Sequence, residues 1–244
     1  MKLSVVIPAY NEEGSIAQTL EALYNTLVKY NIDHELFVTN DNSKDATESI
    51  LIQLQKTIPT LNYATNKGPN GFGYAVRYGL ERYSGDCVAV VMADLSDDPE
   101  DLVKYYQKMV EGNFDCVFGS RWDKGGKVYD YPKLKKAINR VANYLVKLLF
   151  RLNYNDCTNA FKLYKRTTID GIKPFLSPHF NLTLELPLKA IVRGYSYAVV
   201  PNSWTNRTSG ESKLKIKEMG SRYFFIMLYC LIEKYFSRGD FRKK

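Results

Sequence analysis

The sequence predicts an α/β fold, with a mostly parallel sheet flanked by helices. Short apolar stretches alternate with stretches of helical spacing through the first 120 residues. Residues 86–92 are continuously apolar after the first residue, which is typical of a strand buried on both faces of a parallel sheet. Polar residues follow several of these apolar stretches directly. In open α/β sheets, that edge is where ligands bind.

The first half of the chain alternates strands and helices in a regular order. We expect strands at residues 3–7, 35–39, 61–65, 86–92 and 115–119, and helices at 14–30, 46–57, 73–83 and 100–111. The first helix shows the spacing clearly, with apolar residues at Ile16, Leu20, Leu23 and Leu27. This alternation predicts right-handed crossovers that place helices on both faces of the sheet.

The pattern changes after Gly119. Residues 120–133 are rich in Gly, Lys, Asp and Tyr and predict a mobile loop over a site. The helix expected at 134–152 has a broad apolar face ringed by Lys and Arg, which fits a packing helix and a helix at a membrane interface equally well. A helix at 182–193, a strand at 196–200 and a polar loop at 201–212 follow.

The last helix contains ten consecutive apolar residues, 223–232. A bilayer span requires ~20 such residues, so this helix lies on a membrane, packs against a subunit or fills the core. Residues 238–244 form a basic tail.

Length and cysteine content indicate one large domain in a reducing compartment. A chain of 244 residues can bury a full core without disulfides or metal. The four cysteines have no close pairing or metal-binding spacing and are expected to be reduced core residues. The first four residues lead straight into a strand, without the apolar segment of a signal peptide. We therefore expect a cytoplasmic protein.

The net charge of +8 is unevenly divided along the chain. Residues 1–120 contain 9 Lys and Arg against 17 Asp and Glu, whereas residues 121–244 contain 25 against 9. The two halves therefore suit different partners. A cation-bound nucleotide suits the acidic half, and an anionic surface or a phosphate-bearing acceptor suits the basic half.

Carboxylates cluster directly after the apolar strand at 86–92. Pro99 and Glu100 suit the first turn of the next helix, and most of the acids from residue 97 to 101 are expected to stabilise that helix start. Asp94 differs because it lies next to the buried strand. It is the candidate ligand for a hard cation that holds a phosphate.

Three other loops provide groups for a bound nucleotide. Residues 8–13 offer an aromatic plane and acceptors after the first strand. After the second strand, Ser43 or Asp45 would cap the next helix, which leaves Asn40 and Asp41 for the ligand. The glycines from residue 71 to 79 let the backbone approach a ligand closely, although they fit the dinucleotide fingerprint poorly because they follow the third strand.

Taken in order, these segments resemble glycosyltransferase family 2, and more closely its branch that transfers sugars to dolichyl or polyprenyl phosphate. The matching pieces are residues 5–13, 41–47, 71–79, 93–96, 119–121, 156–158 with Phe161, and 207–210 with Ser212 and Lys213. The resemblance implies a GT-A catalytic domain at 1–214, with a nucleotide-sugar half at 1–120 and an acceptor half at 121–214. Residues 215–244 would form a C-terminal amphipathic helix and the basic tail.

The resemblance also implies a reaction and its residues. An inverting transferase would move one sugar from a GDP- or UDP-sugar to a polyprenyl phosphate at the cytosolic face of a membrane, to which it binds peripherally. Asp94 would hold Mg²⁺ or Mn²⁺, and Ser96 and Asp97 are the candidates for further ligands to the cation. Arg121, Arg207 and Lys213 would bind phosphates. The donor would be bound by Pro8, Ala9, Tyr10, Glu12, Asn40, Asp41, Gly71, Gly73, Ala93 and Asp94.

Two positions depart from the family pattern. The family usually has an acid where Asn40 stands, and its Asp-x-Asp motif has an acid where Met92 stands. A thioether cannot replace a carboxylate as a ligand for Mg²⁺. Either Ser96 or Asp97 compensates, or the dependence on a cation is weak.

Other functions and partners remain open at this stage. Transfer to a saccharide hydroxyl, as in cell-surface polysaccharide synthesis, would need a base. Asp156 and Glu185 are the candidates, although Asp156 could stabilise a turn and Glu185 could pair with Lys189. A non-catalytic nucleotide-sugar or nucleic-acid binder is a further alternative, given the basic half, but nucleic acid is not the expected partner. A second copy of the chain or a membrane-anchoring partner is compatible with the last helix.

Overall fold

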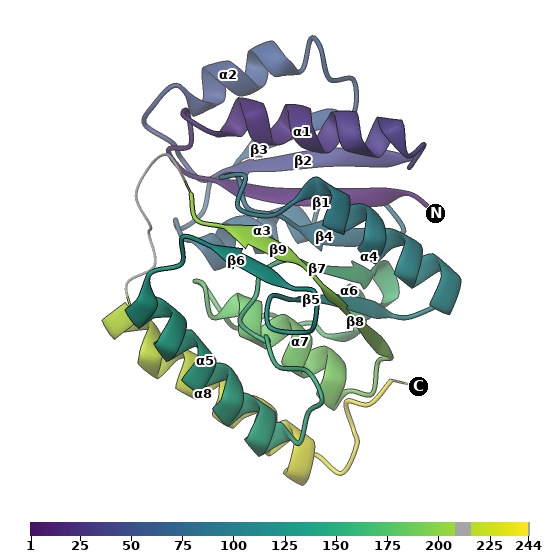
Figure 1. Ribbon diagram of the computed structural model, residues 1–244, viewed down its shortest axis with the longest axis vertical. Coiled ribbons are helices and arrows are strands. Elements are labelled where there is room, and N and C mark those ends of the chain that lie inside the picture. The colour runs from purple at the N-terminus through teal and green to yellow at the C-terminus, as the bar shows by residue number, and fades with distance from the viewer. Residues whose placement is uncertain (208–215, 244) are drawn as a thin grey trace.

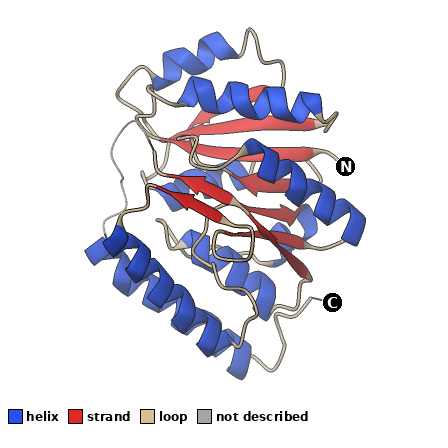
Figure 2. Ribbon diagram, in the orientation of Figure 1, coloured by secondary structure: helices blue, strands red, loops and turns tan. Residues whose placement is uncertain are grey.

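The structure is a computed structural model that describes residues 1–207 and 216–243, with side chains for 1–207 and 220–243. Its centre is a seven-stranded sheet in the order β3-β2-β1-β4-β7-β5-β8 (Figures 1 and 2). β7 runs antiparallel to both of its neighbours, and the other pairs in this sheet are parallel. The prediction of a mostly parallel sheet is confirmed. The strands are β1 (Leu3–Ala9), β2 (His34–Asn40), β3 (Leu61–Thr65), β4 (Cys87–Val90), β5 (Cys116–Ser120), β7 (Lys162–Lys165) and β8 (Tyr197–Pro201).

Helices cover both faces of the sheet, because successive side chains of each buried strand point to opposite sides. Val5 and Ile7 of β1 pack into the core beneath α1, α2 and α4, whereas Val6 packs into the core beneath α3, α6 and α7. α5 and α8 add a further layer on this second side. The helices are α1 (Ile16–Lys29), α2 (Thr47–Leu54), α3 (Phe72–Leu80), α4 (Pro99–Gly112), α5 (Lys133–Phe150), α6 (Arg166–Gly171), α7 (Leu182–Val192) and α8 (Ile216–Phe236).

Several elements differ from the sequence prediction. β6 (Lys127–Tyr129) and β9 (Ser203–Thr205) pair with each other inside the two segments predicted to be irregular loops. β7 and α6 were not predicted, and β4 ends at Val90, two residues earlier than expected. The sequence of β7 has no apolar run that would predict a strand, because it begins with Lys162. This lysine is nevertheless buried, and its amine donates to the carbonyl oxygens of Cys157 and Thr183.

α5 and α8 lie side by side along one edge of the molecule (Figure 1). Buried polar contacts hold α8 in place: Arg193 and Glu233 form an ion pair at 2.7 Å, and Lys234 donates to the Phe150 carbonyl oxygen. The outward surfaces of both helices are largely apolar. Their exposed apolar side chains are Leu134, Ile138, Val141, Tyr144, Leu145, Leu148 and Leu149 on α5, and Phe224, Phe225, Leu228, Ile232, Tyr235 and Phe236 on α8. We call these residues the α5/α8 apolar face.

Two further findings concern the cysteines and the helices. All four cysteines are free and buried, as the sequence predicted. Among the helices of the described ranges, none combines the length and the hydropathy that a membrane crossing requires.

Candidate active site

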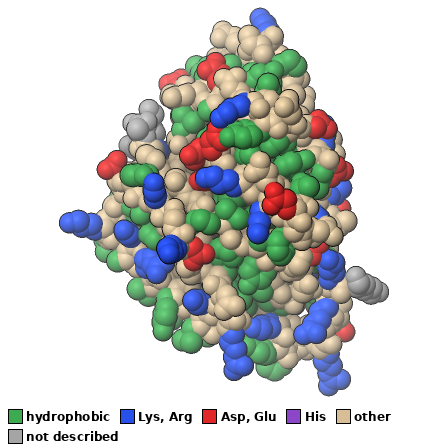
Figure 3. Space-filling view, turned by 45° about the vertical axis from the view of Figure 1, so that its right-hand side comes forward, with side chains coloured by type: hydrophobic (Ala, Val, Ile, Leu, Met, Phe, Trp, Pro, Cys, Tyr) green, Lys and Arg blue, Asp and Glu red, His purple; other side chains and the backbone are tan. Residues whose placement is uncertain are grey.

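A cavity of about 560 Å³ lies at the carboxyl ends of the central parallel strands. The acidic half of the chain contributes residues that follow β1, β2 and β4, and the basic half contributes residues from α5, α8 and the loops around β5, β7 and β9. Figure 3 shows most acidic side chains of the visible face in its upper part, and Lys and Arg gathered lower down among exposed hydrophobic side chains. The cavity therefore joins the two halves that differ in charge.

Asp41 connects the end of β2 to the start of α3 at one end of the cavity. One carboxylate oxygen accepts a hydrogen bond from Asn66 Nδ2 at 2.8 Å, and the other accepts from the Gly71 backbone N–H at 2.7 Å. Gly71 has a φ of 148°, and a Cβ at this position would lie 2.9 Å from His179 Nδ1 and from the Pro178 carbonyl oxygen. A glycine is required here on both grounds.

A cluster of carboxylates around Arg207 lines the middle of the cavity. Arg207 Nη2 and Nε donate to Asp94 Oδ2 at 2.7 and 3.1 Å, and Nη2 also lies 3.3 Å from Glu12 Oε1. The other oxygen of Asp94, Oδ1, accepts from the Ser96 backbone N–H. Although burial lowers the pKa of Arg207, its hydrogen bond to Asp94 raises it, and the net effect is a raised pKa.

Asp97 lies in the same part of the cavity but is buried. Its Oδ1 atom has no hydrogen-bond partner among the described residues. Burial raises the pKa of Asp97 to about 8, and the negative charge of Asp94 adds to this effect. A buried carboxylate oxygen without a partner is costly, and its presence next to Asp94 favours a ligand at this position.

These residues fit a divalent cation that is also held by a substrate. No cluster of three or more His, Cys, Asp or Glu side chains suited to a metal occurs within residues 1–207 and 220–243. The two carboxylates of Asp94 and Asp97 are nevertheless a suitable set, because Mg²⁺ is commonly bound by one or two carboxylates together with phosphate oxygens.

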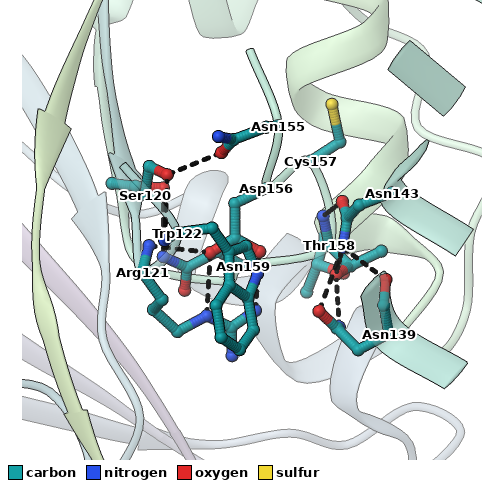
Figure 4. A network of polar contacts seen from close by, with 12 residues as sticks. Ser120, Arg121, Trp122, Asn139, Asn143, Asn155, Asp156, Cys157, Thr158 and Asn159 are labelled. Carbon is teal, nitrogen blue, oxygen red and sulfur yellow. Dashed lines mark hydrogen bonds and ion pairs between the residues drawn. The ribbon is translucent and has the colours of Figure 1, made fainter. Parts of the chain in front are cut away.

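Arg121 lines the cavity on the basic side and is held by Asp156 (Figure 4). The guanidinium donates from Nε and Nη2 to the two oxygens of Asp156 at 2.8 and 2.7 Å, and the Arg121 backbone N–H donates to the same carboxylate. Burial lowers the pKa of Arg121, but the charge of Asp156 outweighs this and raises it. The guanidinium therefore stays charged in a buried position, with its geometry fixed by two parallel hydrogen bonds.

The segment that follows Asp156 is tied to α5 (Figure 4). The Thr158 hydroxyl accepts hydrogen bonds from Asn139 Nδ2 and Asn143 Nδ2, each at 2.8 Å. Asn143 Oδ1 in turn accepts from the Thr158 backbone N–H. These contacts connect the helix that carries half of the α5/α8 apolar face to the loop that positions Arg121.

Comparison with known proteins identifies the family. The profile of glycosyl transferase family 2 matches residues 4–172. The chain belongs to glycosyl transferase family 2.

Curated relatives of this family 2 chain include enzymes named for lipid-linked mannose. The chain is 31% identical over 221 residues to the dolichol-phosphate mannosyltransferase of Pyrococcus furiosus, and this match covers 89% of the chain and 60% of the relative. It is 27% identical over 216 residues to the polyprenol monophosphomannose synthase of Mycolicibacterium smegmatis, with 86% and 80% covered. Glycosyltransferase AglD of Haloferax volcanii is 26% identical over 219 residues, with 88% and 35% covered. The chain thus spans 60% of the first relative and about a third of AglD.

Solved structures confirm the fold. Glucosyl-3-phosphoglycerate synthase from Mycobacterium tuberculosis, in complex with Mn²⁺, UDP-glucose and phosphoglyceric acid, matches with a TM-score of 0.73 at 19% identity, covering 94% of this chain and 79% of that one. The same enzyme in complex with Mg²⁺ and UDP matches with a TM-score of 0.69. The predicted GT-A fold of this family 2 chain is therefore confirmed.

The cavity brings together most of the residues that the sequence singled out. From the acidic half these are Pro8, Ala9, Tyr10, Glu12, Asp41, Gly71, Asp94, Ser96 and Asp97, and from the basic half they are Arg121 and Arg207. Lys213 lies outside the described residues. The family's first acid has no counterpart at Met92, which nonetheless lines the cavity.

Five predicted site residues lie outside the cavity lining, and each has a structural contact that explains its position. Asn40 is buried at the end of β2, where its Oδ1 accepts from the Ser43 N–H. A Cβ on Gly73 would lie 2.5 Å from Ser177 and Pro178 backbone atoms, so Gly73 provides close packing. The Ala93 carbonyl oxygen accepts from the hydroxyls of Ser15 and Thr19.

The two candidate bases, Asp156 and Glu185, are the other predicted site residues that lie outside the cavity lining. Asp156 is fully buried and bound to Arg121. Glu185 is fully buried, pairs with Lys189 at 2.6 Å and accepts from the backbone N–H groups of Leu176 and Ser177. The expectation that either could act as a base in this cavity is wrong, because their oxygens are committed to these core contacts.

Sequence reasoning missed most of the basic and aromatic lining of the second half. Lys135 at the start of α5 and Arg222 on α8 line the cavity, as do Tyr131, Trp204, His179 and Tyr223. Lys135 was visible only as one of several lysines around an apolar helix. The sequence does show a basic residue in the first turns of each amphipathic helix. Which basic residue faces the cavity, however, depends on how the helices pack.

Proposed function

We propose that this protein transfers a single sugar from a nucleoside-diphosphate sugar to a polyprenyl phosphate, with inversion at the anomeric carbon, at a membrane surface. One observation carries the proposal: a single cavity connects the carboxylates after β4 to the basic residues of α5 and α8, whose outer surfaces are apolar. The printed names of two relatives, a dolichol-phosphate mannosyltransferase and a polyprenol monophosphomannose synthase, support the same class of acceptor.

The donor occupies the acidic end of the cavity. Pro8, Tyr10, Asp41 and Gly71 surround the nucleoside, and the diphosphate lies toward the middle, against Asp94 and Asp97. These two carboxylates, with Ser96 beside them, hold Mg²⁺ or Mn²⁺. The cation supplies positive charge that stabilises the leaving diphosphate.

The acceptor phosphate occupies the basic end. Arg121, Lys135 and Arg222 line this part of the cavity. A phosphate monoester is already anionic at neutral pH, so it needs to be positioned rather than deprotonated. Inversion requires its oxygen to approach the anomeric carbon from the side opposite the diphosphate, which suits an acceptor that enters from the α5 and α8 side.

The α5/α8 apolar face provides the membrane contact. Phe236 is 77% exposed and Leu134 is 72% exposed, and the same helices carry Lys135, Lys136, Arg140, Lys147, Arg222 and Lys234. Apolar area together with basic residues is the pattern that binds a helix into the interface of an anionic bilayer. On this basis, residues 1–214 form the catalytic domain, and residues 215–244 add the helix and tail that complete the membrane surface.

A transfer assay tests the reaction. GDP-[¹⁴C]mannose and UDP-[¹⁴C]glucose are each incubated with Mg²⁺ and vesicles that contain or lack undecaprenyl phosphate. We expect label to enter the lipid phase only with undecaprenyl phosphate, and Asp94→Asn to lose this transfer. Asp98→Asn is the matched control, because Asp98 is exposed and caps α4 through the Glu100 N–H. Label found only on a saccharide acceptor, or no transfer from any donor, would exclude the proposed reaction.

Vesicle flotation tests the membrane contact separately. Replacing Phe224, Phe225 and Leu228 with serine removes exposed apolar area from α8 and should weaken binding to anionic vesicles. Replacing Ile52 and Val110 with serine removes exposed apolar residues from α2 and α4, on the other side of the sheet, and should leave binding unchanged. Equal binding by wild type and the α8 variant would contradict this role.

A further inference from the structure

We propose that Arg207 competes with the divalent cation for the carboxylate of Asp94, and that it leaves Asp94 and Glu12 for the diphosphate when cation and nucleotide bind together. The guanidinium thereby makes cation binding dependent on nucleotide. This rests on the proposed function only in its assignment of the cation to Asp94 and Asp97.

The first support is the position of the guanidinium. Arg207 Nη2 and Nε both donate to Asp94 Oδ2, and Nη2 also reaches Glu12 Oε1. Asp94 Oδ1 is already occupied by the Ser96 N–H. A carboxylate oxygen has two acceptor sites, so the two contacts with Arg207 fill Oδ2, whereas Oδ1 accepts one hydrogen bond. A cation that binds Oδ2 must displace the guanidinium.

The second support is the charge of the cluster. Glu12, Asp94 and Asp97 bring three carboxyl groups to one side of the cavity, and Arg207 contacts the first two of them. The Arg207 side chain is 14% exposed. Two like charges on one carboxylate repel each other strongly where water is largely excluded. The guanidinium and a divalent cation therefore bind Asp94 alternately.

The third support is the chemistry that a displaced guanidinium would meet. Its planar fork matches phosphate oxygens as well as it matches a carboxylate. A nucleoside diphosphate that binds with the cation brings phosphate oxygens to the displaced guanidinium, and the cation alone brings none. Binding of the two is then positively coupled, and by linkage the coupling acts equally in both directions.

Mn²⁺ binding in the absence and presence of nucleotide measures this exchange. The fraction of bound Mn²⁺ is read by electron paramagnetic resonance for wild type, Arg207→Gln and Arg222→Gln, first alone and then with saturating GDP or UDP. Arg222 lines the same cavity, so Arg222→Gln removes the same charge from the same space. We expect Arg207→Gln to bind Mn²⁺ alone about tenfold more tightly than wild type, since a charge-assisted contact has been removed from the site.

The measurements with added nucleotide give the second expected result. Wild type should gain affinity for Mn²⁺ when the nucleotide is added, and Arg207→Gln should gain clearly less. Arg222→Gln should match wild type for Mn²⁺ alone. Adding Asp94→Asn to Arg207→Gln should abolish the tighter binding of Mn²⁺ alone that Arg207→Gln shows, because the cation then lacks its carboxylate.

Several outcomes would overturn the proposal. These are wild-type or weaker affinity for Mn²⁺ alone in Arg207→Gln, equally tightened binding of Mn²⁺ alone in Arg222→Gln, or no Mn²⁺ binding in any variant. If Arg207→Gln does not fold, Arg207→Met decides: methionine removes the charge and keeps an apolar stem, so Mn²⁺ affinity should rise above wild type, and an unchanged affinity refutes the exchange. The assay contains neither sugar nor acceptor. Failure of lipid transfer with an intact exchange therefore concerns the sugar donor or the acceptor and not the exchange.

Discussion

Replacing Asp156 with Asn should destabilise the protein strongly while hardly changing the shape of the side chain. Asp156 is fully buried and accepts three hydrogen bonds from Arg121, two from the guanidinium and one from the backbone. The variant leaves a buried guanidinium without its counter-charge. Breaking a buried ion pair by removing one partner typically costs about 3–5 kcal/mol.

Urea denaturation and calorimetry measure this effect. For a chain of this length each kcal/mol lowers Tm by about 2–4 °C, so the midpoint should fall by about 6–20 °C. Asp123→Asn is the matched control, since Asp123 lies two residues from Arg121, is only partly buried and accepts from Asn155 Nδ2. Adding Arg121→Met to Asp156→Asn should restore part of the lost stability, because the unpaired charge is then removed. A loss below about 1 kcal/mol for Asp156→Asn would refute the reasoning.

Two other predictions concern stability. Burial lowers the pKa of Lys162 to about 7. Between pH 7 and about 10 the unfolded chain therefore binds more protons at this residue than the folded chain does, so the stability of wild type should rise with pH relative to that of Lys162→Met. The same change in urea midpoint between pH 7 and 9.5 for wild type and for Lys162→Met would contradict this. Gly73→Ala should destabilise by about 1–3 kcal/mol, because its Cβ would lie 2.5 Å from backbone atoms of Ser177 and Pro178. Gly220→Ala, in helix α8 with nothing within 4 Å, should instead stabilise by about 0.5–1 kcal/mol, and equal Tm shifts would count against this account of the two glycines.

The first half of the fold was predictable because its signals are local. β1 and β4 are short apolar runs between polar segments, and α1 buries Ile16, Leu20, Leu23 and Leu27, the positions that the helical spacing marked. Asp98 caps α4, and Pro99 follows in the first turn. Each of these choices depends on residues within about one turn of the chain.

The second half was less predictable because its structure depends on distant partners. β7 begins with a lysine whose amine is satisfied only by carbonyl oxygens five and 21 residues away. β6 and β9 are three residues each and acquire strand structure from pairing across 76 positions of sequence. Arg121 and Asp156 were each marked as candidates, but their pairing over 35 residues appears only in the fold. Glu185 was recognised as a possible partner of Lys189, and the structure shows that pairing.

The carboxyl groups of the cavity give an argument about the acceptor. Glu12 and Asp94 contact Arg207, and in the proposed bound state Glu12 is assigned to the donor and Asp94 to the cation. Burial raises the pKa of Asp97, and in the proposed bound state its oxygens are committed to the cation. His179 lies beside Gly71 at the end of the cavity proposed for the nucleoside, and Asp156 and Glu185 point into the core. An acceptor hydroxyl would need one of these groups to remove its proton. An acceptor that is already an anion needs only the charges of Arg121, Lys135 and Arg222, which is what the basic end of the cavity provides.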